Sequence, residues 1–166
     1  DRTDIGDPNP DFTFGMTNTF SYKGFNLSVL IQGSYGNDIY NVLRAETNIV
    51  STWGNQRKEV NDHWTPTNTN AKYPRVIGKS WYESGTGAQS FWIRNGAYLR
   101  LKNLNVGYNL PKSWISFLNL ESAQLFVNGT NLFVLSAMTE FHDPEQDCYD
   151  SYPLMKSFTF GVDIKF

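Results

Sequence analysis

The sequence predicts an all-β fold in which antiparallel up-and-down strands form part of a large transmembrane β-barrel, with one long extracellular loop excursion. The first observation is strict alternation at the end of the chain, where apolar side chains occupy every second position: Phe158, Phe160, Val162, Ile164 and Phe166. Alternation with period two places them on one face of a strand. A closing strand that ends on an aromatic residue is typical of outer-membrane barrels. The second observation is that the alternating stretches are about 11 to 14 residues long, enough for a tilted strand to cross a membrane.

Five stretches of the chain alternate in this way, and they predict strands at residues 11–22, 25–35, 97–110, 122–135 and 156–166. Between the first two, Lys23 and Gly24 form a predicted two-residue turn. In the third stretch the apolar positions change phase between Leu101 and Leu104. One extra residue in a β-bulge explains this change.

The connections between these strands divide by length, which is the third observation. If Phe166 lies at the periplasmic end, the alternating strand directions place segments 37–96 and 136–155 outside, and the turn at Lys23 and segment 111–121 inside. Transmembrane barrels have long extracellular loops and short periplasmic turns. Segment 37–96 is too long for a structureless loop in a compact domain. It contains four of the five tryptophans: Trp53, Trp64, Trp81 and Trp92.

Composition and charge exclude several classes of protein. There is no run of about eighteen apolar residues, so a transmembrane helix is excluded. Aromatic residues make up 16% of the chain, a supply that suits the aromatic girdles of a barrel. The net charge is −2 and the basic residues are scattered, which argues against a nucleic-acid partner. The chain begins at Asp1 without a signal segment, and we therefore expect a mature end product or a C-terminal piece of something longer.

Several motifs resemble, in order along nearly the whole chain, the last third of SusC/RagA-type TonB-linked outer-membrane transporters. They are IGDPNPDF at 5–12, SYKGFNLS at 21–28, QGSYGNDIYN at 32–41, WTP at 64–66 with YPR at 73–75, YLRLKNL at 98–104 with GYNLP at 107–111, NGTNLF at 128–133 and TFGV at 159–162.

The resemblance implies TonB-dependent import of nutrient oligomers, either glycans or oligopeptides, through the outer membrane of a Gram-negative bacterium. It also implies four partners. They are a SusD-like surface lipoprotein that caps the barrel, the TonB complex, outer-membrane lipid and the barrel-assembly machinery. The TonB complex would act through an N-terminal part that is absent from these residues. The plug domain and the remaining strands are also absent from this segment. Five strands cannot close a transmembrane barrel, so we expect the segment to pair with other strands.

The candidate site residues follow from this interpretation. Polar positions between the apolar ones are predicted to line the lumen: Ser28, Gln32, Asn105, Gln124 and Asn128. The four tryptophans of segment 37–96 are candidates for contact with the substrate or the cap, because flat aromatic faces stack on sugar rings; packing of the loop itself is the competing interpretation. The resemblance implies that Phe158, Phe160 and Phe166 are a barrel-assembly signal, read by strand addition at an open edge.

No catalytic, metal or cofactor site is predicted. His63 and His142 lack the spaced partners of a zinc site, and Asp62 beside His63 is better explained by loop packing than by catalysis. Four acidic residues in segment 136–155 lack the spacing of a calcium loop and favour a solvated acidic loop: Asp143, Glu145, Asp147 and Asp150.

Two other classes of function stay open at this point. One is a soluble all-β carbohydrate-binding module, whose aromatic side chains would form a platform for sugars. The other is a structural protein whose strands support an assembly without transporting anything. Fold alone does not decide between these classes.

Overall fold

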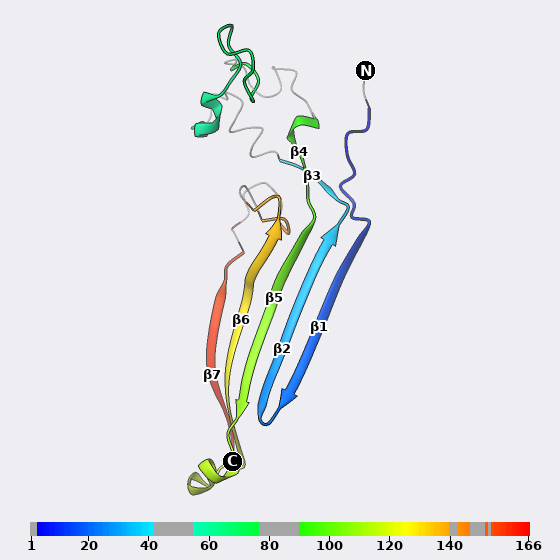
Figure 1. The fold of residues 1–166 in the computed structure, drawn as a ribbon. Helices are drawn as coiled ribbons and strands as arrows, with labels where there is room; N and C mark the ends of the chain where they lie inside the picture. Colours follow the sequence, from blue (N-terminus) through cyan, green and yellow to red (C-terminus); the bar gives the residue numbers. More distant parts are fainter. Residues whose placement is uncertain (1–2, 42–54, 77–89, 140–142, 147–151, 153) are drawn as a thin grey trace.

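Five long strands form one antiparallel sheet in a computed structural model that describes residues 3–41, 55–76, 90–139, 143–146, 152 and 154–166. Their order in the sheet is β1-β2-β5-β6-β7 (Figure 1). The strands are β1 (Phe12–Tyr22), β2 (Phe25–Tyr35), β5 (Tyr98–Asn109), β6 (Ser122–Ser136) and β7 (Ser157–Lys165). The sheet is not closed, because β1 and β7 each have a partner on only one side. The predicted all-β antiparallel fold is confirmed, and an open sheet of this kind is consistent with part of a barrel.

The β1–β2 hairpin turns at Lys23 and Gly24. Both residues have positive φ, 45° and 90°, and Tyr22 pairs with Phe25 on either side of them. Two consecutive residues with positive φ define the turn whose twist matches that of paired strands. Glycine adopts this conformation without a steric penalty, which explains why the second position is Gly24.

A β-bulge lies in the middle of the sheet, as the change of phase in the sequence predicts. Leu101 pairs with Ile31 of β2, and Asn103 pairs with Leu30, so Lys102 is the extra residue. On the other side of β5 the register with β6 also shifts between Leu101 and Asn103. The bulge keeps the apolar residues of β5 on one face before and after the shift.

The two ends of the sheet differ. At the upper end in Figure 1, two long connections leave the strands; at the lower end are the Lys23 turn, a short helical connection and the chain terminus. The connection between β5 and β6 contains α2 (Lys112–Ile115) and η3 (Ser116–Leu118). The connection between β2 and β5 contains β3 (Asp38–Tyr40), η1 (Lys58–Asn61), η2 (Ser90–Trp92) and β4 (Ile93–Asn95). No helix in the described part of the chain has both the length and the apolar character needed to cross a membrane.

The two faces of the sheet have opposite chemistry, because paired residues of neighbouring strands project to the same side. One row crosses all five strands with apolar side chains: Phe20, Leu27, Val106, Val127 and Phe160. We call the side of this row the apolar face. The adjacent row, on the opposite side, is polar: Thr19, Ser28, Asn105, Asn128 and Thr159. We call this side the polar face.

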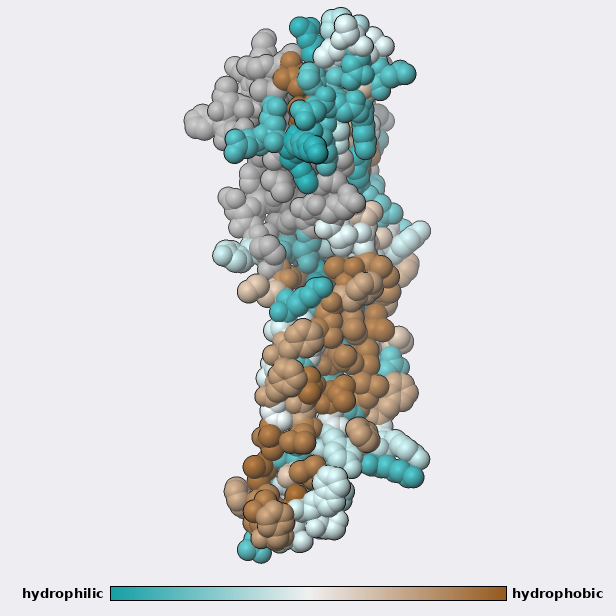
Figure 2. Space-filling model, turned by 60° about the vertical axis from the view of Figure 1, so that its left-hand side comes forward, coloured by the Kyte–Doolittle hydropathy of each residue, from teal (hydrophilic) through white to brown (hydrophobic). Residues whose placement is uncertain are grey.

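The apolar face is open to its surroundings in this segment. Phe160 is 75% exposed, and Phe20, Val106 and Val127 are exposed as well. Figure 2 shows apolar residues gathered over the strand region, below hydrophilic residues at the loop end. Monomeric soluble proteins rarely expose an apolar patch that extends over several strands. Such a surface suits a sheet that is covered by other apolar material.

Candidate functional site: the polar face and the loop bound to it

The structure places all five predicted lumen residues on the polar face. Ser28, Asn105 and Asn128 lie in a single row, since Asn105 pairs with Ser28 on one side and with Asn128 on the other. Gln32 pairs with Arg100 nearer the end with the long connections. Gln124 lies at the opposite end, where its strand partners are Asn109 and Asp163. The five residues therefore form a band along the polar face, and their place in a lumen stays a prediction.

An ion-pair network joins the polar face to the connection between β6 and β7. Arg100, on β5, is only 2% exposed, and its Nη2 lies 2.5 Å from Oδ1 of Asp143. Its Nε lies 2.6 Å from Oε2 of Glu145. The two carboxylates are each about 15% exposed and come from the same short turn. One buried guanidinium therefore holds two acidic residues more than forty positions away in sequence.

Glu145 is the centre of this network. Its carboxylate accepts hydrogen bonds from Nε2 of Gln32 and from the hydroxyl of Tyr98, the latter at 3.2 Å. The ammonium of Lys102 lies 3.2 Å from Oε2 of the same group. Donors from both β2 and β5 thus converge on one side chain of the connection.

The turn itself is ordered by Asp143. Its Oδ1 accepts the backbone N–H of Glu145 at 3.0 Å, and its carbonyl accepts the N–H of Gln146 at 3.1 Å. Pro144, between the two acids, is buried. An Asp side chain that bonds to the backbone two residues later is a common way to stabilise a turn. Residues 143–146, which we call the tether turn, are therefore fixed both internally and to the sheet.

The sequence-based prediction of a solvated acidic loop is wrong for Asp143 and Glu145, because both side chains are largely buried and ion-paired. Removing one partner of a buried pair costs about 3–5 kcal/mol, since the other charge stays buried and uncompensated. Among the described residues, no group of three or more His, Cys, Asp or Glu side chains could hold a metal ion. Asp147 and Asp150 lie outside the described residues. Sequence reasoning missed Arg100 and Lys102, although their alternation on β5 places both cations on the polar face.

The tryptophans of the excursion have different environments. Trp92 is 1% exposed and packs with Tyr73 and Tyr40 in a small core. The hydroxyl of Tyr73 donates to Oε2 of Glu59 at 2.6 Å, which satisfies its polar atom. Trp64 is 38% exposed, so its ring has a face available for a partner. Trp92 has none, and the loop-packing interpretation fits it better. Trp53 and Trp81 lie outside the described residues.

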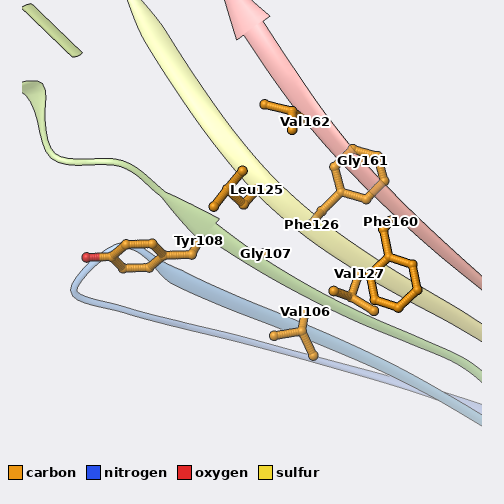
Figure 3. Close-up of a pocket in the computed structure, with 9 residues that line it drawn as sticks. All are labelled: Val106, Gly107, Tyr108, Leu125, Phe126, Val127, Phe160, Gly161 and Val162. Atoms are coloured by element: carbon orange, nitrogen blue, oxygen red, sulfur yellow. The ribbon is translucent and has the colours of Figure 1, made fainter. Parts of the chain in front are cut away.

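A shallow groove lies over the lower half of β5, β6 and β7, and Figure 3 shows the residues that line it. Its side chains are mainly those of two neighbouring apolar rows: Val106, Val127 and Phe160, and Tyr108, Leu125 and Val162. A ligand site normally combines an apolar wall with a few convergent polar groups. Here the lining is almost entirely apolar, so the groove belongs to the apolar face and carries no separate chemistry.

The terminal strand presents its aromatic residues on the apolar face. Phe158 pairs with Gly129, Phe160 pairs with Val127, and both side chains are exposed. Phe166, the last residue, is also exposed and follows the end of β7. Because β7 has a partner only in β6, its other edge is open to a further strand. The geometry is compatible with strand addition, and the role as an assembly signal stays a prediction.

Known proteins similar to this chain are receptors and importers. TonB-dependent receptor P3 of Formosa agariphila is 35% identical over the whole chain, and TonB-dependent receptor P26 of the same organism is 31% identical over the whole chain. TonB-dependent receptor SusC of Bacteroides thetaiotaomicron is 24% identical over 96% of the chain. The chain spans only 17%, 18% and 15% of these three relatives, respectively. No family model matches the sequence.

The fold comparison agrees with the sequence comparison. The solved structure of the RagAB peptide importer in its closed-closed state matches 95% of this chain with a TM-score of 0.77 and 26% sequence identity. The matched part is 17% of that chain. The open-open state matches with a TM-score of 0.75. The resemblance stated from the sequence motifs is confirmed: over its whole length, this chain is similar to one segment of TonB-dependent receptors of the SusC and RagA type.

Proposed function

We propose that this chain is part of the barrel wall of an outer-membrane TonB-dependent importer of nutrient oligomers in a Gram-negative bacterium. The observation that carries the proposal is the match to TonB-dependent receptor P3 along the entire chain, at 35% identity. The relatives are named as receptors and importers, which supports transport and not catalysis. Oligopeptides are a candidate cargo because the matched structures are of a peptide importer, and glycans are the other candidate that the resemblance implies.

In this proposal the two faces of the sheet contact different environments, lipid on one side and the lumen on the other. The apolar face contacts the hydrocarbon of the outer membrane, because alternating strands of such barrels direct apolar residues outward. The polar face, with Ser28, Gln32, Asn105, Gln124 and Asn128, lines the lumen. Further strands of a longer polypeptide pair with the open edges of β1 and β7 and close the barrel. A plug and a TonB-contacting segment belong to that same polypeptide.

The partners follow from this placement. A SusD-like surface lipoprotein covers the end with the long connections, and the exposed Trp64 of the excursion contacts this cap or its cargo. The barrel-assembly machinery recognises the terminal strand with Phe158, Phe160 and Phe166. Energy comes from a TonB complex through parts of the receptor outside this segment.

The soluble carbohydrate-binding module is the weaker interpretation. A module that functions alone must bury its apolar residues, yet the apolar face is exposed along five strands. Two open sheet edges would also be a hazard for a free-standing domain. Neither feature is a liability in a wall that continues into further strands and lipid.

Gene deletion in the source bacterium tests the proposal. The full-length receptor gene is removed, and growth is measured on single oligosaccharides or oligopeptides as the limiting nutrient, with tonB depletion in parallel. We expect growth on one nutrient class to be lost in both strains and to return when the receptor is restored. Unchanged growth on every nutrient tested would contradict an import function. Co-purification of a surface lipoprotein with the detergent-extracted receptor tests the proposed cap.

A further inference from the structure

The tether turn is held more firmly to the polar face than a surface connection requires. Arg100 contacts both carboxylates of the turn at 2.5 and 2.6 Å and is almost completely buried. Gln32, Tyr98 and Lys102 add contacts to Glu145 from two strands. A buried charge network of this kind is costly unless all of its members are satisfied. Moving the turn away would leave the buried Arg100 charge without its carboxylates, so the ion pairs favour one arrangement of the turn on the sheet.

The position of the network determines what it can do. Gln32, Tyr98 and Arg100 lie on the polar face, near the end of the sheet from which the long connections leave, and Lys102 of the bulge reaches the same carboxylate. The tether turn therefore lies in front of β2 and β5 on that face and does not extend the sheet outward. If the polar face lines a lumen, the turn occupies space at the mouth of that lumen.

We propose that Arg100 is a positioning residue of the import pathway, which holds residues 143–146 against the inner wall so that the turn narrows the entrance. This inference rests on the proposed function, because it requires the polar face to be the inner one. It adds that the width of the entrance depends on one buried ion-pair centre. Solutes smaller than the narrowed mouth pass it, and larger ones are held back.

The first test is hydrogen–deuterium exchange on the full-length receptor in detergent. Arg100→Met removes the ion pairs with little change in side-chain length, and Arg100→Lys keeps the charge but can reach fewer acceptors. In Arg100→Met we expect the peptide covering residues 143–146 to exchange at least tenfold faster, while the β6 peptides stay unchanged. Arg100→Lys should fall between this variant and the parent. Unchanged exchange in Arg100→Met would overturn the inference.

The second test measures the width of the entrance in intact cells. A reporter thiol is introduced by Asn103→Cys, on the polar face beyond the tether turn, in a receptor whose native cysteines, including Cys148, are replaced by serine. A small cationic thiosulfonate and a 5-kDa polyethylene glycol maleimide are the probes. We expect Arg100→Met to raise the labelling rate with the large probe at least fivefold and to change the rate with the small probe less than twofold. Equal rates with the large probe in parent and variant would overturn the inference.

Control variants keep the second test decisive. If Arg100→Met does not reach the outer membrane, the double variant Asp143→Asn with Glu145→Gln weakens the same pairs from the side of the turn and should give the same increase. Glu121→Gln, in an exposed pair at the opposite end of the sheet, should give none. Failure of the proposed function has its own signature. A thiol from Val29→Cys on the apolar face would then react in intact cells more readily than the thiol at position 103.

Discussion

Gly33 offers the sharpest test of how the sheet packs. It is a buried residue of β2, between Phe14 on β1 and Leu99 on β5. A Cβ atom at this position would lie 2.5 Å from the carbonyl oxygen of Tyr98 and 2.8 Å from the ring of Phe14. Favourable contacts between heavy atoms lie near 3.5–4.0 Å. The substitution Gly33→Ala therefore forces about 1 Å of movement between strands that are hydrogen-bonded to each other.

The expected cost is that of overpacking, about 1–3 kcal/mol, because a backbone carbonyl in a ladder cannot turn away as a flexible side chain can. The gain from replacing glycine in a strand, about 0.5–1 kcal/mol, offsets only part of it. Gly15→Ala is the matched control. Gly15 is in the neighbouring strand β1, and a Cβ atom there would have nothing within 4 Å. We expect this second variant to be as stable as the parent, or slightly more stable.

The assay is the temperature at which half of the purified full-length receptor loses the compact, folded band in detergent electrophoresis. Gly33→Ala should lose this band at a lower temperature than the parent, and Gly15→Ala should not. Folded receptor in the outer membrane, measured by immunoblot, should follow the same order. Equal stability of the two variants would refute the argument, because it would mean that β2 and β5 can separate at this point without loss.

Three further predictions concern other parts of the chain. Gly24→Ala places a side chain at φ 90° in the first hairpin and should destabilise the receptor by about 1 kcal/mol in the same assay. Trp92→Ala should open the small core of the excursion at a cost of about 3–5 kcal/mol, seen as faster proteolysis within residues 55–95, whereas Trp64→Ala should leave the cleavage rate unchanged. Glu121→Gln removes an exposed pair with Lys165 and should change stability by only about 0–1 kcal/mol; a larger loss would show that the pair is shielded in the complete barrel.

Much of the sheet could be predicted because strand alternation is a local property of the sequence. The apolar period locates each long strand, and its break between Leu101 and Leu104 locates the bulge. The tight turn at Lys23 and Gly24 follows from the conformations that glycine permits. The polar positions between the apolar ones then share one face by geometry alone, which is why the five predicted lumen residues lie on the same face.

The tether turn could not be predicted in the same way. Arg100 and Asp143 are far apart in sequence, and no period connects a strand residue to a side chain in a long connection. An acidic segment in isolation has the composition of a solvated loop. Only the folded chain shows that the buried Arg100 forms ion pairs with this acidic segment. The excursion posed a similar problem, because no alternation distinguishes buried Trp92 from exposed Trp64.

The long excursion between β2 and β5 also bears on the order in which the sheet forms. The β1–β2 hairpin and the β5–β6–β7 meander pair strands that are close in sequence, so each can form early. The β2–β5 contact closes a much longer loop. The chain must lose the conformational entropy of this loop before the pairing contributes favourable free energy. The short ladder of β3 and β4 brings the two ends of the excursion together next to this contact, and the backbone N–H of Asn41 donates to the carbonyl of Trp92 at 3.0 Å. We therefore expect the two local units to form first and to pair along β2 and β5 in a later, slower step, with the excursion aligning these two strands.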